Sequence, residues 1–153
     1  MPSLPRASDL TAHLGFWLRT VSNQVSQAFA DKLAAKDVTI AEWTMMRALY
    51  GKDPMSPSRL ADEIGAIPPT ITKLANRLIT KSLVVRRTER HDRHPQTLAL
   101  TPQGTSLVPE LAALADRNDA DFFHHLTEDE RQTLERLLKR MVARWQMIAM
   151  PIR

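Results

Sequence analysis

The sequence contains no cysteine among its 153 residues. Disulfide bonds, thiol redox switches and thiolate metal sites are therefore excluded. No stretch of about 18 apolar residues is present, so no membrane-spanning helix is expected. Residues 1–6 also lack the apolar core of a secretory signal. We therefore expect a soluble, cytoplasmic protein without a membrane partner.

Glycine is scarce, with four residues, and no glycine-rich phosphate loop, nucleophile–base signature or metal motif is present. Histidine is the residue type that could support catalysis or metal binding, and the chain has five: His13, His91, His94, His124 and His125. The pair at 91 and 94 lies among cations, which would repel a metal ion. The adjacent pair at 124 and 125 would point in different directions on a helix. We expect no enzyme activity, no cofactor and no metal site.

Apolar residues make up 43% of the chain, and their spacing predicts helices interrupted by one hairpin. Helices are predicted over about 9–35, 39–51, 56–65 and 68–81, strands over 83–88 and 96–100 with a charged tip at 89–95, and two final helices from 102 and 127. Caps are predicted at Thr39, Ser56, Gly65, Thr101 and Thr127. The predicted fold class is mainly α with a small β-hairpin.

A helix–turn–helix is predicted over residues 56–81. Two closely crossing helices need small residues at the contact, and Ala61 and Gly65 supply them, while Ile71 fills the angle. A basic hairpin follows at once, as in a winged helix-turn-helix. We therefore predict a DNA-binding lobe over 38–101.

The two ends of the chain, residues 1–37 and 102–153, carry long helices with apolar faces that the small middle lobe cannot cover. Exposed apolar surface on that scale usually finds a partner. We predict that these ends form a dimerisation region and that the protein is a homodimer. The alternative is that these helices pack only on their own chain.

Positive charge is concentrated between Lys73 and Arg93, where seven cations and two acids give a net +5, whereas the rest of the chain carries −1. A focused basic patch on a near-neutral body is typical of polyanion binding. A solvated basic face is the alternative that charge alone leaves open.

The predicted DNA contacts lie on three segments. On the outer face of the fourth helix, lysine, arginine and asparagine can pair with base edges, and threonines can reach phosphate or a thymine methyl group. Serines at the start of the third helix can donate to phosphate, and wing arginines can enter a minor groove. The predicted residues are Ser56, Ser58, Thr70, Thr72, Lys73, Asn76, Arg77, Arg87, Arg90 and Arg93.

Three runs resemble the MarR family of bacterial transcription regulators: residues 60–65 (LADEIG), 78–84 (LITKSLV) and 89–104, which include an Asp-Arg pair and Leu-Thr-x-x-Gly. The resemblance spans almost the whole chain. It implies a dimer joined by its terminal helices that binds an inverted-repeat operator, represses nearby promoters and releases DNA when a small, often aromatic, anion binds.

The sequence departs from the family pattern at three positions. The family has a glycine after the recognition helix, which corresponds to the fourth predicted helix here, and Ser82 replaces it. A serine would be strained at this position if the backbone is left-handed. Asn76 stands where aspartate is common, so an ion pair is expected to be missing. Pro109 is expected to interrupt and kink the helix that contains it.

A pocket for the effector is the least direct prediction. The resemblance places it between the first two helices and the DNA-binding lobe, and the candidate residues are His13, Trp17, Trp43 and Met46. The alternative is that the tryptophans and the methionine are core residues. A regulator without a ligand, or a winged helix that binds protein, would also fit the sequence.

Overall fold

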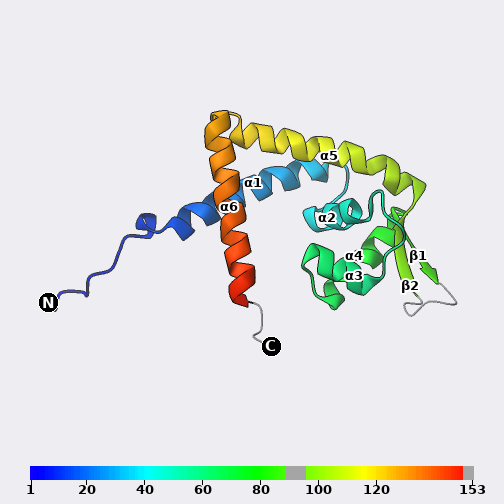
Figure 1. The fold of residues 1–153 in the computed structure, drawn as a ribbon, viewed down its shortest axis with the longest axis horizontal. Helices are drawn as coiled ribbons and strands as arrows, with labels where there is room; N and C mark the ends of the chain where they lie inside the picture. The colour runs from blue at the N-terminus through cyan, green and yellow to red at the C-terminus, as the bar shows by residue number, and fades with distance from the viewer. Residues whose placement is uncertain (89–95, 150–153) are drawn as a thin grey trace. The chain divides into compact units, whose positions relative to one another are not determined.

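The computed structural model describes residues 1–88 and 96–149 (Figure 1). Its elements follow the predicted order. They are the 3-10 turn η1 (Leu10–Ala12), α1 (Leu14–Ala34), α2 (Ile40–Leu49), α3 (Pro57–Ile64), α4 (Pro68–Thr80), β1 (Val84–Thr88), β2 (Gln96–Leu100), α5 (Pro102–Phe123) and α6 (Glu128–Ala149). Contacts divide the chain into two units, Met1–Asn118 and Asp119–Arg153. Within the described residues, every helix is too short or too polar to span a membrane.

The first helix begins later than predicted. Leu10 lies in the separate turn η1, and His13 has an extended backbone (φ −100°, ψ 127°) just before α1. Asp9 makes no side-chain cap that could extend the helix backwards, and the Trp17 indole donates to the Thr11 carbonyl at 2.9 Å. The prediction that His13 and Trp17 lie one turn apart on a single helix is therefore wrong.

The predicted caps are confirmed. Thr39 forms a capping box at the start of α2, and Ser56 accepts the Arg59 amide before α3. Gly65 ends α3 with φ 69°. Thr101 accepts the Gly104 amide before α5, and Thr127 forms a second capping box before α6. These local hydrogen bonds place the element ends close to where the sequence predicts them.

The main apolar core joins α2, α3, α4 and the hairpin to the C-terminal end of α1 and to the first half of α5. The four predicted inner residues of α4 are all buried: Ile71, Leu74, Ala75 and Leu78. Figure 1 shows α2, α3 and α4 on one side of the hairpin, which lies at the edge of the lobe. Helix α4, the predicted recognition helix, thus packs on the core with one face only.

The two strands pair antiparallel, from Val84 opposite Leu100 to Thr88 opposite Gln96. Met55 adds a bridge by exchanging backbone hydrogen bonds with Leu98 at 2.9 and 2.8 Å. Ser82, between α4 and β1, has φ 62°, so its backbone is in the left-handed conformation in which serine is predicted to be strained. The predicted tip, with its wing motif, lies outside the described residues.

The predicted interruption at Pro109 is wrong, because α5 runs without a break from Pro102 to Phe123. A proline inside a helix removes one amide donor and crowds the preceding turn. Pro109 is exposed, so its ring faces solvent, and the helix continues on the packing of Val108 and Leu111, which are buried on the other side.

Candidate nucleic-acid interface

The outer face of α4 is polar and exposed. It presents the predicted residues Thr70, Thr72, Lys73, Asn76 and Arg77. Lys73 has no hydrogen-bond or ion-pair partner among the described residues, so its ammonium is available to a ligand. Thr72 donates to the Pro68 carbonyl at 3.3 Å, as threonines in helices often do.

Asn76 has a partner on the wing. The Arg86 guanidinium donates to its Oδ1 at 3.0 Å. The expected ion pair is therefore missing, and a charge-assisted hydrogen bond from arginine to a neutral amide stands in its place. This contact joins β1 to the recognition helix, and it orients the Asn76 amide before any DNA is bound.

Arg77 and the C-cap residue of α4, Lys81, turn toward a buried carboxylate. Arg77 Nη2 lies 3.4 Å from Glu42 Oε1, and Lys81 Nζ lies 3.1 Å from each Glu42 oxygen. Glu42 is 0% exposed. Arg77 thus has a protein partner while 44% of its side chain remains exposed, and its DNA contact stays a prediction.

The pKa of Glu42 is set by opposing effects. Burial raises the pKa of Glu42. Four interactions lower it by more than burial raises it: the hydrogen bond from the Thr39 backbone, the hydrogen bonds of the Lys81 and Thr39 side chains, and the positive charge of Lys81. The net result is a pKa below the ordinary value. Glu42 therefore stays ionised at neutral pH and neutralises part of the charge at the end of α4.

The remaining predicted contacts are spread around the lobe. Ser56 is half-buried and occupied as the N-cap, with its hydroxyl 3.4 Å from that of the exposed Ser58. Arg87 is exposed on β1. Arg90 and Arg93 lie outside the described residues. The structure thus brings the α4 face, the wing base and the start of α3 into one lobe, and the contacts themselves stay predictions.

The predicted effector residues have different surroundings. Met46 is fully buried in the core. Trp43 is half-buried and packs edge-on against Phe29, with ring centroids 6.4 Å apart. Trp17 lies twelve residues before Phe29 on α1, which is roughly 18 Å along the helix axis. His13 precedes the helix, so the monomer does not bring the four side chains together.

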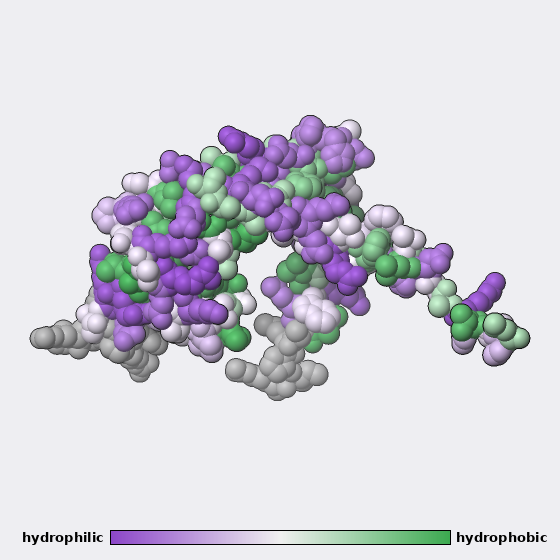
Figure 2. Space-filling model, turned by 180° about the vertical axis from the view of Figure 1, so that it is seen from behind, coloured by the Kyte–Doolittle hydropathy of each residue, from purple (hydrophilic) through white to green (hydrophobic). Residues whose placement is uncertain are grey.

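Apolar side chains remain uncovered on both terminal segments, as the rear view in Figure 2 shows. On α1 the predicted stripe is exposed at Leu14 and Trp17 but buried at Leu33. On α6 an exposed row follows spacings of four and three residues: Leu134, Leu138, Met141, Trp145 and Ile148. Alternating spacings of this kind are typical of helix–helix seams.

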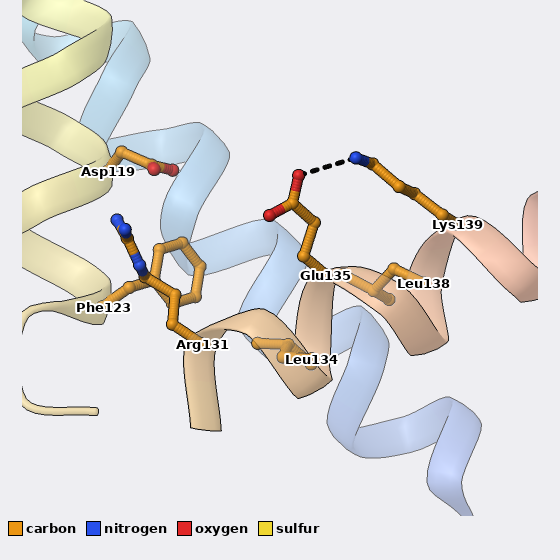
Figure 3. Close-up of a pocket in the computed structure, with 7 residues that line it drawn as sticks. All are labelled: Asp119, Phe123, Arg131, Leu134, Glu135, Leu138 and Lys139. Carbon is orange, nitrogen blue, oxygen red and sulfur yellow. Dashed lines mark ion pairs between the residues drawn. The ribbon is translucent and has the colours of Figure 1, made fainter. Parts of the chain in front are cut away.

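Part of the α6 row lines a groove within the C-terminal unit (Figure 3). Phe123, Leu134 and Leu138 provide its apolar surface. Charged residues border it, including the ion pair between Glu135 and Lys139 at 2.8 Å. An apolar strip between charged edges is typical of a surface that binds another helix.

Comparison with known proteins identifies the family. Residues 36–93 match the family model described as the MarR family. A protein of Thauera aromatica, described as a transcriptional regulatory protein for the hcr operon, is 32% identical over 134 residues, covering 87% of this chain and 81% of that protein. The chain belongs to the MarR family.

Solved structures show the same winged-helix fold. BpsR of Bordetella bronchiseptica, from a study of its regulation by 6-hydroxynicotinic acid, has a TM-score of 0.80 at 22% identity, covering 90% of this chain and 98% of its own. A mutant MarR from E. coli, complexed with operator DNA, has a TM-score of 0.76 at 23% identity, covering 84% and 92%. CouR from Rhodococcus jostii, bound to p-coumaroyl-CoA, has a TM-score of 0.72 at 22% identity, covering 96% and 99%.

MarR proteins are transcription regulators and not enzymes, so this chain is a transcription regulator with a DNA-binding winged helix. Two residues of its lobe escaped the sequence reasoning. Arg86 is not among the predicted contacts, and no pattern in the sequence predicts its bond to Asn76. Glu42 had one, because Thr39-Ile40-Ala41-Glu42 fits a capping box, but that pattern does not predict burial.

Proposed function

We propose that this protein is a homodimeric, sequence-specific repressor. In each subunit α4 enters a major groove and the wing approaches the adjacent minor groove, so that the dimer binds an inverted repeat with half-site centres roughly 34 Å apart. The observation that carries the proposal is the division of α4. One face is locked into the core, and the other presents Lys73, which has no partner among residues 1–88 and 96–149.

The uncovered rows on α1 and α6 support the homodimer. Trp145 is 70% exposed and Leu14 is 87% exposed, which is a poor arrangement for a lone subunit in water. Solvent-exposed apolar area of this extent is stabilised when a second copy covers it. The division into a dimerisation region (1–37 and 102–153) and a DNA-binding lobe (38–101) is part of the same proposal.

The test is selection of duplexes from genomic fragments with the purified protein. We expect enrichment of an inverted repeat and repression of the adjacent promoter in transcription assays in vitro. Affinity should fall steeply with salt, because each neutralised phosphate releases counterion. A flat salt response would favour the alternative of a winged helix that binds protein.

We also propose that a small aromatic anion releases the DNA. The support comes from two proteins of similar fold: BpsR, whose DNA binding is regulated by 6-hydroxynicotinic acid, and CouR, whose structure was solved with p-coumaroyl-CoA bound. The half-buried Trp43 is placed to report such binding, because it contacts both α1 and the lobe. Titration with aromatic carboxylates should change tryptophan fluorescence and weaken DNA binding together. Unchanged fluorescence and undiminished DNA binding would leave a regulator that needs no ligand.

A further inference from the structure

Helix capping alone does not explain why the Glu42 side chain is buried. Burial of a carboxylate is costly unless strong partners compensate. Glu130 forms the same capping box with Thr127 at the start of α6 while fully exposed. No other acidic side chain among residues 1–88 and 96–148 is buried. The additional contacts of Glu42, to Lys81 and Arg77, therefore distinguish it.

Those contacts join two parts of the chain that are distant in the sequence: the turn after α1 with the start of α2, and the end of α4. Glu42 Oε1 accepts the Thr39 amide at 2.9 Å, in the turn that follows α1. The same carboxylate lies 3.1 Å from Lys81 Nζ, at the last turn of α4. Lys81 Nζ also donates to the Asp37 carbonyl at 2.6 Å. The end of the recognition helix is thus bonded directly to the turn that leaves α1.

The charges suit this connection. Lys81 lies at the C-cap of α4, where the helix dipole favours a cation. Glu42 lies in the first turn of α2, where the dipole favours an anion. Each charge is therefore stabilised by its own helix as well as by its partner, and Lys81 is only 26% exposed. Charge-assisted bonds that are shielded from water hold their geometry better than surface pairs.

We propose that Glu42 is a positioning residue for DNA recognition. By holding Lys81 against the turn after α1, it transmits the separation of the two α1 helices in the dimer to the two recognition helices. It thereby restricts the half-site spacing that the dimer accepts. This inference rests on the proposed function, because it requires a homodimer on an inverted repeat.

The alternative is that the Glu42 cluster only stabilises the fold. The two roles predict different effects on how the affinity for DNA depends on half-site spacing. A purely stabilising cluster changes the fraction of active protein, which affects all duplexes equally. A positioning residue changes the ratio between the affinity for the selected operator and the affinity for the same half-sites moved one base pair closer or further apart. Because both affinities are measured on one preparation, the active fraction cancels.

The experiment uses Glu42→Gln in the full chain. Glutamine also serves in a capping box, so the start of α2 is retained while the charged bond to Lys81 is lost. We call the ratio between the affinity for the selected operator and the affinity for the shifted half-sites the spacing ratio. We expect Glu42→Gln to lower the spacing ratio by about twofold to thirtyfold, the range seen when residues that couple two sites are changed. Lys81→Met, which leaves the Thr39 contact of Glu42 intact, should reduce the ratio in the same direction.

The matched control is Glu128→Gln, which removes one charge and the exposed 3.3 Å ion pair with Arg131 within α6 and touches neither the turn after α1 nor α2 nor α4. Its spacing ratio should equal that of the parent. An unchanged ratio in Glu42→Gln, or in Lys81→Met if Glu42→Gln does not fold, would overturn the inference. If the parent protein selects no inverted repeat at all, the proposed function fails instead, so the two failures are distinguishable.

Discussion

Ser82 occupies a backbone conformation that suits glycine. Its φ of 62° places its Cβ close to neighbouring backbone atoms, and the turn is fixed on both sides. The Ser82 carbonyl accepts the Thr101 hydroxyl at 2.7 Å, and the next amide, that of Leu83, donates to the Leu78 carbonyl at 2.9 Å. The strain is therefore retained at the junction of recognition helix and wing.

Ser82→Gly should stabilise the protein by about 0.5–1 kcal/mol, because relief of the left-handed strain exceeds the added freedom of the unfolded chain. Urea unfolding of parent and variant measures this difference. Ser82→Ala keeps a Cβ and should give no gain. A glycine variant less stable than the parent would show that Ser82 is not strained.

Lys73→Ala should weaken operator binding by about 1–3 kcal/mol and relax preference at one base position if the lysine contacts a base. The physical reason is that Lys73 is an exposed cation of α4 to which no residue in the described part of the chain is bonded. Titration of labelled operator and of single-base variants measures both effects. Arg117→Ala removes the same charge from the exposed surface of α5 and should bind like the parent; equal losses in both variants would show that only net charge matters.

At the scale of elements, α2 and α4 are connected through ionised groups. The pKa of Glu42 lies below its ordinary value of 4.5 in the folded protein. A group of this kind stabilises the folded state above its unfolded pKa, and the contribution is lost as pH falls through the folded pKa. Acid should therefore weaken the contact between recognition helix and α2 in particular.

Glu42→Gln should cost about 1–3 kcal/mol of stability at pH 7, because a charged hydrogen-bond acceptor is lost. The difference from the parent should shrink as pH falls below 4.5, because the unfolded parent chain then takes up a proton on this carboxyl before the folded protein does. Urea unfolding at a series of pH values from 7 to 3.5 measures it. A difference that stays constant with pH would mean that ionisation of Glu42 contributes nothing to folding.

Local chemistry predicted the elements well but not their tertiary contacts. Thr39, Ser56 and Gly65 mark helix ends because their bonds are made within a few residues. The start of α1 was missed because the indole of Trp17 holds a separate turn at Thr11, a contact that apolar spacing does not encode. The site was predicted as a set of exposed residues, whereas the bonds of Asn76 and Arg77 depend on β1 and α2, which only the folded chain brings close.

At the scale of the whole molecule, the exposed apolar row on α6 is the feature that most supports the proposed homodimer. The five apolar residues follow one another along a single stripe, from Leu134 to Ile148. On the opposite side of the helix lie exposed polar or small residues such as Arg136 and Ala143, with one exposed apolar residue, Met147, near the C-terminal end. Up to Trp145 the helix is thus two-faced, as dimer helices are.

Met141→Asp should raise the dissociation constant of the homodimer by at least about a hundredfold, because a buried unpaired charge is costly. Sedimentation equilibrium measures it, and operator affinity should fall with dimer content. Ala143→Asp adds the same charge on the opposite face of α6 and should leave the dimer intact. A Met141→Asp protein that sediments like the parent would place the interface elsewhere.

If these apolar stripes are covered only in the proposed homodimer, the abundance of the DNA-binding form rises as the square of total protein when copies are rare. Promoter occupancy would then respond more sharply to dilution by growth, or to proteolysis, than it would for a regulator that acts alone. Halving the cellular level could relieve repression by nearly fourfold with no ligand present.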